Sequence, residues 1–439
     1  MKNKRFFTLL ASIISLTKHI DVLVKKTPLF IYLIICCSSI YSQTTKEEFL
    51  SDIKYASGVY QPYIYTNSEL TQAPEGYKPF YISHYGRHGS RYLEPAESYT
   101  VVSDILYKAH VDKKLSTFGE SLFERIRLFA LDAEARYGDV TPLGIKEHKE
   151  IAQRMFQNFP EIFNPNNQKK CYVYSRSTVV PRCILSMTAN NESLKELNPD
   201  IIIERNATKR DTYLNNSYKV PYRDSINAVS KNFIQNNFDF GTYFVKVFSD
   251  TVYANKLVTD KADFISKLYY LVADIQDVNH LNISMTDVFS KDELFILWQS
   301  SNIKLYMVFT SKAAVDSSKK LLKNILDCAD NAIKNNNISA DLRFGHDSYI
   351  APLLTLMDVK GTNIKENDPN KIYKAWCDFK VTPMAVNLQL IFYKNEKEGE
   401  VIVKLLHNEK EVEIPVKTNI FPYYSWTDIK EYYFKKLIN

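Results

Sequence analysis

The dominant pattern along the chain is a short apolar run followed by a longer amphipathic stretch, and it occurs several times. Apolar runs typical of β-strands cover residues 80–84 and 171–174, and residues 340–344 predict a further strand because apolar and polar positions alternate there. Helical stretches follow each run, the second starting near Pro181 and the third at Asp347. A strand followed by a helix, repeated, favours a parallel α/β layer.

The helix predicted from residue 142 has the clearest start. Thr141 suits the N-cap, and Pro142 suits the first turn because no helical hydrogen bond needs the N–H that proline lacks. The apolar positions of this helix share one face and are Leu143, His148, Ile151, Ala152, Met155 and Phe156. Later, a helix is predicted over residues 315–335, two strands at 386–394 and 400–408 predict a hairpin, and an amphipathic helix follows them.

Residues 197–314 differ in composition from the segments around them. Asn, Asp, Lys and aromatic residues dominate there, and helical periodicity runs through residues 255–275. We therefore expect a three-layer α/β sandwich with a mainly parallel sheet and helices on both faces, formed by residues 44–196 and 315–439. Residues 197–314 are expected to form an inserted α-helical cap, with the active site in the cleft between the two parts.

The N-terminal 43 residues resemble a targeting segment. Lys25 and Lys26 precede an apolar run at 29–40, and small or polar residues follow, which is typical of a secretory signal. The run is short for a transmembrane helix. The sequence therefore predicts an exported protein, periplasmic or extracellular, with no stable membrane insertion after cleavage. An uncleaved anchor, lipidation at Cys36 with outer-membrane attachment, and a true start near Val24 remain alternatives.

Composition narrows the function classes only a little. With 439 residues, 45% hydrophobic and 24% charged, the chain has ordinary globular composition. The net charge of +6 is spread along the chain without a basic block interleaved with aromatics, so nucleic acid is not an expected partner. Cys171, Cys183, Cys328 and Cys377 form no CxxC motif, which argues against zinc clusters and thioredoxin chemistry. Export permits one or two disulfides, but neither their pairing nor the oligomeric state follows from the sequence.

The strongest chemical signal is the motif RHGSR at residues 87–91, directly after a predicted strand. Open α/β sheets place their ligands at the carboxyl ends of strands. His88 can act as a nucleophile, and the guanidinium groups of Arg87 and Arg91 match phosphate oxygens two at a time. Gly89 lets the backbone approach a ligand closely. The motif therefore predicts a phosphate pocket with a histidine nucleophile.

Two more predicted strand ends carry groups that suit such a pocket. One is followed by Arg176 and then by Arg182, and the other by His346 and Asp347. Three strand ends that supply cationic and titratable groups are what a phosphate site with an acid–base partner requires.

Three motifs together, RHGSR, SRSTVVPR and GHDSYIAPLL, resemble the histidine acid phosphatases, branch 2 of the histidine phosphatase superfamily. This family includes phytases, prostatic-type acid phosphatases and multiple inositol polyphosphate phosphatases, and the C-terminal segment is most similar to bacterial members of the last group. The resemblance covers the chain from about residue 78 onward and implies a phosphoglycerate-mutase-like core. It implies His88 as nucleophile and Asp347 as proton donor. The phosphate-binding residues that it implies are Arg87, Arg91, Arg182 and His346.

The resemblance also implies a reaction. Neutral His88 attacks phosphorus, Asp347 protonates the leaving oxygen, and water hydrolyses the phosphohistidine. The cationic pocket should depress the pKa of His88 and keep it neutral at acidic pH. No metal or cofactor is implied, and the expected partner is a small phosphomonoester, preferably an inositol polyphosphate such as phytate. Because His346–Asp347 is the phytase and acid phosphatase form of the pair, a broad-specificity acid phosphatase acting on sugar phosphates or nucleotides is the alternative.

Rival interpretations concern both the class of protein and single residues. His84, His88, His346 and Asp347 are the candidate ligands of a metallophosphoesterase, and a catalytically idle phosphate receptor is a further rival. His84 is expected to be structural and His148 to be a packed core histidine. Lys209 and Arg210 either contact additional phosphates of the substrate or belong to a solvated charged loop. Arg176 is the alternative to Arg182 as the third phosphate-binding arginine. Glu94 and Glu97 are the alternatives to Asp347 as proton donor.

Overall fold

The computed structural model describes residues 44–164, 170–215, 218–335, 337–395, 397 and 399–438. The predicted targeting segment at residues 1–43, with Cys36 and the alternative start near Val24, lies outside these residues. Among the helices in these ranges, none has the length and apolar character needed to cross a membrane.

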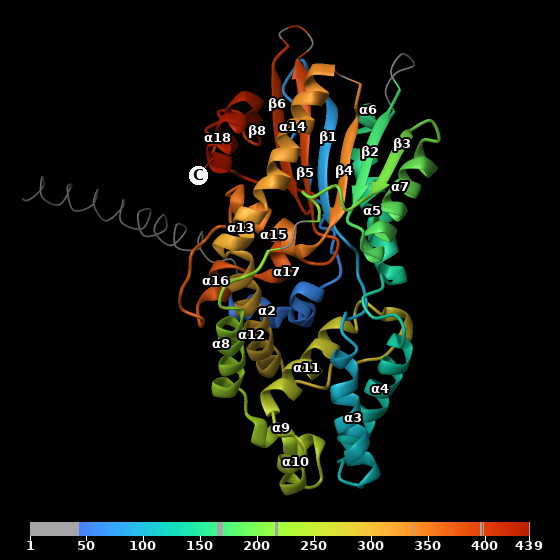
Figure 1. The fold of residues 1–439 in the computed structure, drawn as a ribbon, viewed down its shortest axis with the longest axis vertical. Helices are drawn as coiled ribbons and strands as arrows, with labels where there is room; N and C mark the ends of the chain where they lie inside the picture. Colours follow the sequence, from blue (N-terminus) through green and yellow to red (C-terminus); the bar gives the residue numbers. More distant parts are fainter. Residues whose placement is uncertain are drawn as a thin grey trace, which may run out of the picture.

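One mixed sheet forms the centre of the molecule (Figure 1). Its strands are β1 (Tyr77–Arg87), β2 (Tyr172–Ser177), β3 (Ile202–Ala207), β4 (Ala340–Gly345), β5 (Asn387–Asn395), β6 (Val401–His407), β7 (Lys410–Glu411) and β8 (Tyr423–Ser425). The order is β3-β2-β4-β1-β5-β6-β7, with β8 also paired to β6. The four strands from β3 to β1 are parallel, and β5 and β6 extend the sheet as the predicted antiparallel hairpin.

Helices account for most of the remaining described chain. The α-helices are α2 (Lys46–Ser51), α3 (Glu97–Val111), α4 (Thr117–Ala133), α5 (Pro142–Asn158), α6 (Pro160–Phe163), α7 (Pro181–Leu197), α8 (Arg223–Asn237), α9 (Phe240–Val247), α10 (Thr251–Leu257), α11 (Lys261–Asp274), α12 (Lys291–Phe309), α13 (Lys312–Ser317), α14 (Lys319–Asn335), α15 (Asp347–Leu356), α16 (Ile372–Ala375), α17 (Asp378–Val381) and α18 (Trp426–Ile438). Two 3-10 helices are η1 (Ile53–Tyr60) and η2 (Asn279–Leu281).

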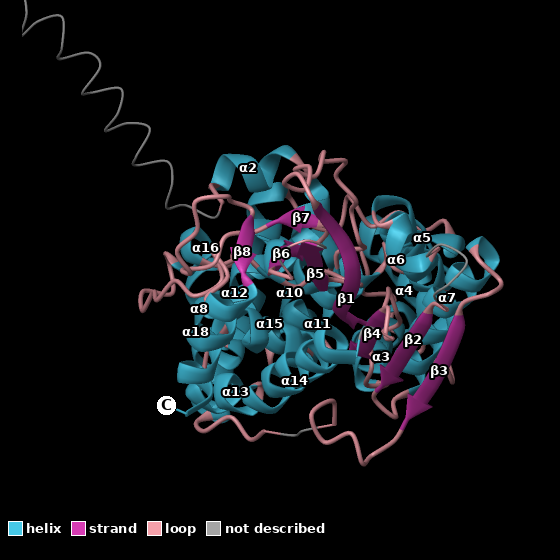
Figure 2. Ribbon diagram, turned by 90° about the horizontal axis from the view of Figure 1, so that it is seen from above, coloured by secondary structure: helices cyan, strands magenta, loops and turns pink. Residues whose placement is uncertain are grey.

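Helices cover both faces of the sheet, as Figure 2 shows from above. Side chains alternate along β1, so consecutive residues enter different apolar clusters. Tyr81 belongs to the cluster that contains Ile325 of α14, whereas Ile82 belongs to the cluster with Ala152 of α5 and Met187 of α7. The α/β sandwich expected from the sequence is therefore confirmed, with the parallel strands β3, β2, β4 and β1 forming one side of the sheet.

Local signals in the sequence set the helix starts. The Thr141 side chain accepts a hydrogen bond from the Gly144 N–H, and Pro142 occupies the first turn of α5. Pro181 likewise starts α7, and Asp347 starts α15. These positions agree with the predicted ones because caps and prolines act locally.

A helical lobe, formed by α3, α4 and α8–α12, lies below the sheet in Figure 1. One apolar cluster joins Leu106 of α3 and Phe123 of α4 to Phe244 of α9 and Leu268 of α11. Helices from before the expected insertion therefore share a core with helices inside it. The domain limits at residues 197 and 314 stay a prediction.

The stretch 197–314 also contains a strand that helical periodicity did not indicate. β3 lies at the edge of the sheet, where all of its side chains are exposed or only partly buried. Its apolar residues, Ile202 and Ile203, are followed directly by polar residues at 204–206, so the strand pattern is short.

The topology sets three carboxyl strand ends side by side. β4 lies between β2 and β1, with Gly345 opposite Arg87 and Phe344 opposite Ser177. Groups that follow these strands therefore meet at one edge of the sheet, next to the helical lobe.

Candidate active site

Backbone hydrogen bonds from both neighbouring strands hold the RHGSR loop. The His88 N–H donates to the Gly345 carbonyl at 2.9 Å, and the Arg87 N–H donates to the Val386 carbonyl at 2.9 Å. On the far side, the Ala385 N–H donates to the His88 carbonyl at 3.0 Å. The backbone of the candidate nucleophile is thus fixed by the ends of β4 and by the residues before β5.

The His88 ring is 1% exposed and has a defined proton position. Its Nδ1 lies 2.9 Å from the Gly89 carbonyl, which can only accept a hydrogen bond. Nδ1 is therefore the donor, and the neutral ring carries its lone pair on Nε2. Burial, together with the charges of Arg87, Arg91 and Arg182, holds the pKa of His88 well below its ordinary value. A buried neutral imidazole with a free lone pair is suited to nucleophilic attack.

Gly89 lies against the backbone of α5, while the close approach to a ligand that the motif indicated stays a prediction. A Cβ atom at this position would lie 2.4 Å from the Gly144 carbonyl oxygen at the start of α5. The obstacle is backbone, so a side chain could not move it aside. The Gly89 N–H also donates to the Ser186 hydroxyl at 3.1 Å, which ties the loop to α7.

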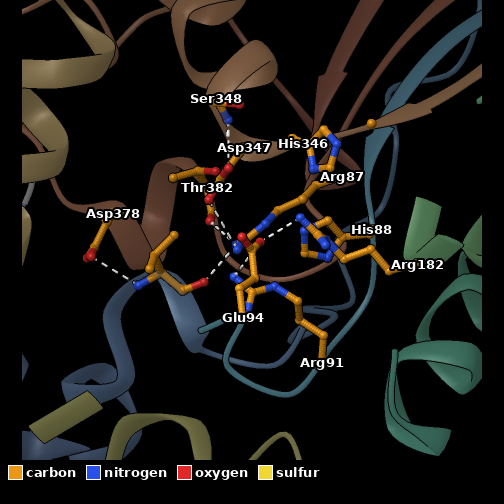
Figure 3. A network of polar contacts seen from close by, with 12 residues as sticks. Arg87, His88, Arg91, Glu94, Arg182, His346, Asp347, Ser348, Asp378 and Thr382 are labelled. Atoms are coloured by element: carbon orange, nitrogen blue, oxygen red, sulfur yellow. Dashed lines mark hydrogen bonds and ion pairs between the residues drawn. The ribbon is translucent and has the colours of Figure 1, made fainter. Parts of the chain in front are cut away.

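Arg87 is 1% exposed and is held at the floor of the site. Its Nη1 donates to the carbonyls of Val59 at 2.7 Å and Thr382 at 2.9 Å. Its Nη2 forms an ion pair with Asp347 Oδ2 at 3.2 Å. These contacts leave the guanidinium charge directed at the space beside His88 (Figure 3).

Arg91 and Arg182 come from different elements and meet at the same carboxylate. Glu94 Oε1 lies 2.5 Å from Arg182 Nη2 and 3.4 Å from Arg91 Nη2. Arg91 is further held by the Tyr92 carbonyl at 2.7 Å, and its guanidinium lies 5.5 Å from the centre of the Tyr60 ring. The buried Nε atoms of Arg91 and Arg182 have no acceptor within the described ranges, so both retain donors for an anion.

His346 and Asp347 stand at the N-terminus of α15, facing His88. The ring centres of His88 and His346 lie 5.6 Å apart. The backbone N–H of His346 donates to the Tyr85 hydroxyl at 3.1 Å. Burial, with Arg182 as the next cause, lowers the pKa of His346 to about 4.

Asp347 is ionised in this arrangement. Burial acts to raise the pKa of its carboxyl, but the Arg87 charge and the Ser348 N–H at 2.7 Å contribute to an opposite effect that outweighs it. The net pKa lies below the ordinary value. Asp347 therefore takes up a proton only when a bound anion competes for Arg87 or when the pH is low.

All six residues predicted for the site lie together at this edge of the sheet (Figure 3). They are Arg87, His88, Arg91, Arg182, His346 and Asp347. Their arrangement places a histidine between arginines, with a second histidine and a carboxylate opposite. The roles assigned to them from the sequence remain predictions.

His84 does not join the site. Its ring packs 5.3 Å from Phe344 and would collide with a Cβ at Gly86, and burial lowers its pKa to about 3. Among the residues that the structure describes, no group of three or more His, Cys, Asp or Glu side chains is arranged to hold a metal ion. The ligand set named for the metallophosphoesterase alternative is thus not assembled.

His148 is buried at 1% exposure, as expected for a core histidine, but it also contacts the loop. Its Nε2 donates to the Arg87 carbonyl at 3.0 Å. The four cysteines assigned to the mature chain are free thiols. Cys183 lies against the site, with its sulfur 3.6 Å from His346 Nε2 and within hydrogen-bonding distance of the Gly345 carbonyl.

The sequence did not point to several residues that hold the site in place. Glu147, which is 4% exposed, accepts hydrogen bonds from the Ser90 N–H at 2.8 Å and the Ser90 hydroxyl at 2.9 Å. Asp378 accepts from the Val59 N–H at 3.0 Å and so fixes the carbonyl that receives Arg87. The one available signal for Glu147 was its place on α5, next to the apolar face.

The two candidates for the third arginine point to different places. Arg182 reaches Glu94 and contributes to the lowered pKa of His88. Arg176 turns to the sheet edge, where its Nη2 binds the Glu204 carboxylate at 3.0 Å. The geometry therefore favours Arg182.

We expect Arg182→Lys to reduce kcat/KM nearly as much as Arg182→Ala, by about 10²-fold or more. Lysine keeps the charge but loses the planar fork that binds two phosphate oxygens. Steady-state kinetics with an aryl phosphate measures the effect, and Arg176→Ala is the matched control, expected to stay within a few-fold of wild type. A crippled Arg176→Ala variant beside a mild Arg182→Ala variant would reverse the assignment.

Comparison with known proteins agrees with this geometry. The buried histidine lies among arginines at the carboxyl ends of the parallel strands, an arrangement that suits the binding of a phosphate group. The family model described as histidine phosphatase superfamily (branch 2) matches residues 86–408. The chain therefore belongs to the histidine phosphatase superfamily, branch 2, as the three motifs indicated.

Solved structures share the fold at low sequence identity. A multiple inositol polyphosphate phosphatase from Bifidobacterium longum, in complex with inositol hexasulfate, superposes with a TM-score of 0.71 and 19% identity, over 86% of this chain and 97% of that chain. The phytase from D. castellii superposes with a TM-score of 0.66 and 15% identity, over 90% of this chain and 87% of that chain. A search of curated proteins found no match.

Proposed function

We propose that this protein is an exported phosphomonoester hydrolase that acts through a phosphohistidine on His88. The observation that carries the proposal is the neutral, buried His88 ring, whose Nδ1 is bound to the Gly89 carbonyl, among Arg87, Arg91 and Arg182. Membership of the histidine phosphatase superfamily supports the phosphatase activity.

In the proposed reaction the His88 Nε2 lone pair forms a bond to phosphorus while the bond to the leaving oxygen breaks. Protonated Asp347 gives its proton to that oxygen, and the guanidinium groups stabilise the charge on the phosphoryl oxygens. The Gly89 carbonyl holds the Nδ1 proton as the ring becomes positive. Water then attacks phosphorus, Asp347 takes one proton from it, and the phosphorus–nitrogen bond breaks to regenerate neutral His88.

We propose inositol polyphosphates, including phytate, as the substrate class. A hollow of about 360 Å³ adjoins the site and is lined in part by His346, Thr178, Tyr349 and Lys209. Lys209 is exposed and lines the hollow, and the nearby carboxylate of Glu204 is paired with Arg176. Lys209 is therefore available to a second phosphate of a substrate whose first phosphate lies on the arginines. The inositol hexasulfate bound to the Bifidobacterium longum enzyme is a ligand of this multiply anionic kind.

A change of Lys209 to Gln should raise the KM for phytate about three- to tenfold more than the KM for p-nitrophenyl phosphate. The aryl substrate has one phosphate and gains nothing from a second cation. Arg210→Gln is the matched control, because it removes the same charge from the adjacent exposed residue, which does not line the hollow. Equal KM changes on both substrates would contradict a second-phosphate role for Lys209.

Phosphate release from a panel containing phytate, a sugar phosphate, a nucleotide and an aryl phosphate tests the proposed function. We expect turnover of phytate with the highest kcat/KM, inhibition by vanadate, and unchanged rates in excess chelator. Comparable kcat/KM values across the panel would identify a broad-specificity acid phosphatase instead. Activity lost in chelator and restored by a divalent metal would contradict the proposed mechanism.

Export is proposed from the basic and apolar segment that ends near residue 43. Expression of the full chain in a bacterial host, followed by cell fractionation and N-terminal sequencing of the product, tests it. A mature N-terminus near residue 43 in the exported fraction is the expected result, and an intact N-terminus in the cytosolic fraction would contradict it.

A further inference from the structure

Glu94 occupies the space between the two arginines at the mouth of the site (Figure 3). A single carboxylate oxygen, Oε1, lies 2.5 Å from Arg182 Nη2 and 3.4 Å from Arg91 Nη2. Arg91 belongs to the loop after β1, and Arg182 to the first turn of α7. The carboxylate therefore joins two segments that are separate in the sequence and that both supply phosphate donors.

The two sides of this contact differ in how firmly they are held. The side chains of Arg91 and Arg182 are only 8% and 14% exposed, whereas that of Glu94 is 49% exposed. Arg91 has further anchors in the Tyr92 carbonyl and the Tyr60 ring. Glu94 Oε2 makes no hydrogen bond to any residue in the described ranges. Arg91 is thus anchored without Glu94, Arg182 is mostly buried, and the half-exposed carboxylate can turn toward solvent.

A carboxylate oxygen and a phosphate oxygen are acceptors of the same kind, and guanidinium groups bind both. The position of Glu94 Oε1 between two Nη2 atoms is one that a phosphate oxygen would take when bound to both arginines. A phosphate that enters must displace the Glu94 carboxylate or lie next to it. Either event costs free energy, through a lost ion pair or through repulsion between like charges.

We propose that Glu94 is a displaceable internal ligand of Arg91 and Arg182, which competes with phosphate for them and thereby weakens the binding of inorganic phosphate. This inference rests on the proposed phosphatase function. In the free site Glu94 holds the two like-charged arginines in place. After the phosphohistidine is hydrolysed, its return to the arginines displaces the product phosphate.

A Glu94 that competes with phosphate for the arginines differs from a Glu94 that acts as a general acid. A competing carboxylate affects the binding of any phosphate, whatever the leaving group, and its loss strengthens binding. An acid affects the rate, and its loss slows poor leaving groups most. Inhibition by inorganic phosphate, which has no leaving group, separates the two.

The test is Glu94→Gln, which keeps the shape and removes the charge. We expect the competitive inhibition constant of inorganic phosphate, measured against p-nitrophenyl phosphate, to fall about three- to tenfold, as for the loss of one half-exposed charge interaction. Calorimetric titration with inorganic phosphate should give the same change in Kd. The KM for the aryl substrate should fall with it, while kcat does not rise.

Glu97→Gln is the matched control. Glu97 is exposed in the first turn of α3, and within the described chain no hydrogen bond or ion pair involves its side chain. The Glu97→Gln substitution removes the same charge three residues away. An equal fall of the phosphate inhibition constant in both variants would therefore overturn a specific role of Glu94. Thermal unfolding checks that the Glu94→Gln variant is folded, and Glu94→Ala serves as the second variant if it is not.

A Glu94→Gln inhibition constant within about twofold of wild type, in protein that hydrolyses phosphomonoesters, would overturn this inference alone. So would a fall in kcat for an alkyl phosphate of about 10²-fold or more with an unchanged inhibition constant, which would identify a general acid. Wild-type protein that neither releases phosphate nor binds it would overturn the proposed function, and this inference with it.

Discussion

Replacement of His88 by alanine is expected to lower the rate of phosphate release by at least about a hundredfold on every phosphomonoester, because the nucleophile is lost. The arginines that bind the phosphate remain, and the loop is held by backbone hydrogen bonds that alanine also makes. Binding of inorganic phosphate should therefore persist. Steady-state rates on an alkyl and an aryl phosphate, together with calorimetric titration of phosphate, measure the two effects separately.

A control variant and the trapping of the phosphoenzyme complete the His88 experiment. His110→Ala is the control for loss of a histidine, since its ring is half-exposed and bound to Glu120 on the helical lobe. Acid quenching during turnover should trap phosphate on wild-type protein and not on the His88→Ala variant. Retention of more than about a hundredth of the wild-type rate would contradict a covalent mechanism on this residue.

The second large effect concerns Asp347 and depends on the leaving group. An inositol oxygen leaves poorly and needs a proton as its bond to phosphorus breaks, whereas a nitrophenolate is stable without one. Loss of a general acid typically costs about 10²–10⁴ in rate. Asp347→Asn should therefore slow an alkyl phosphate by this factor and p-nitrophenyl phosphate by much less.

Pre-steady-state kinetics shows whether the Asp347 carboxylate also activates the water that hydrolyses the phosphohistidine. If Asp347 also activates water, the variant accumulates phosphoenzyme, and one equivalent of nitrophenol is released before the rate falls. Asp327→Asn, an exposed aspartate paired with Lys323 on α14, is the control. Equal losses on both substrates without a burst would mean that Asp347 orients Arg87 and does not deliver a proton.

The rate of alkyl phosphate hydrolysis should depend on pH through the protonation of Asp347. The pKa of Asp347 is depressed in the free site, so its carboxyl is ionised at neutral pH and its proton must be acquired. A bound phosphate adds negative charge beside Asp347 and competes for Arg87, which raises the pKa of the carboxyl. Rates on an alkyl phosphate should thus fall as the pH rises, while the low pKa of His88 keeps the nucleophile neutral in acid.

The grouping of the candidate site's residues was predictable from the sequence where short motifs follow strands. His88, His346 and the arginine at 182 each stand directly after a strand or at a helix start, and the parallel order of the strands brings them together. Resemblance of the three motifs to one family supplied their proposed roles. Local signals and topology were sufficient for this part.

Contacts made by backbone atoms from distant segments were not predictable. The Arg87 side chain is bound by the carbonyls of Val59 and Thr382, and any residue type supplies a carbonyl. The contact of Glu94 with Arg182 likewise depends on where α7 starts relative to the loop, which no spacing in the sequence records. β3 was missed because its apolar signal is confined to Ile202 and Ile203 and the rest of this edge strand is polar or small.

The pairing of β1 with strands far along the sequence affects how the chain folds. The strand that precedes His88, β1, pairs with β4 and β5, which begin at Ala340 and Asn387. Closing contacts so distant in sequence is slow, because the loop between them loses its entropy before the pairing compensates for it. Until both strands pair with it, β1 has two open edges, and the RHGSR loop lacks the carbonyls and amides that position it. Recovery of activity during refolding therefore reports the joining of β4 and β5 to the sheet, and it should lag behind the formation of helices.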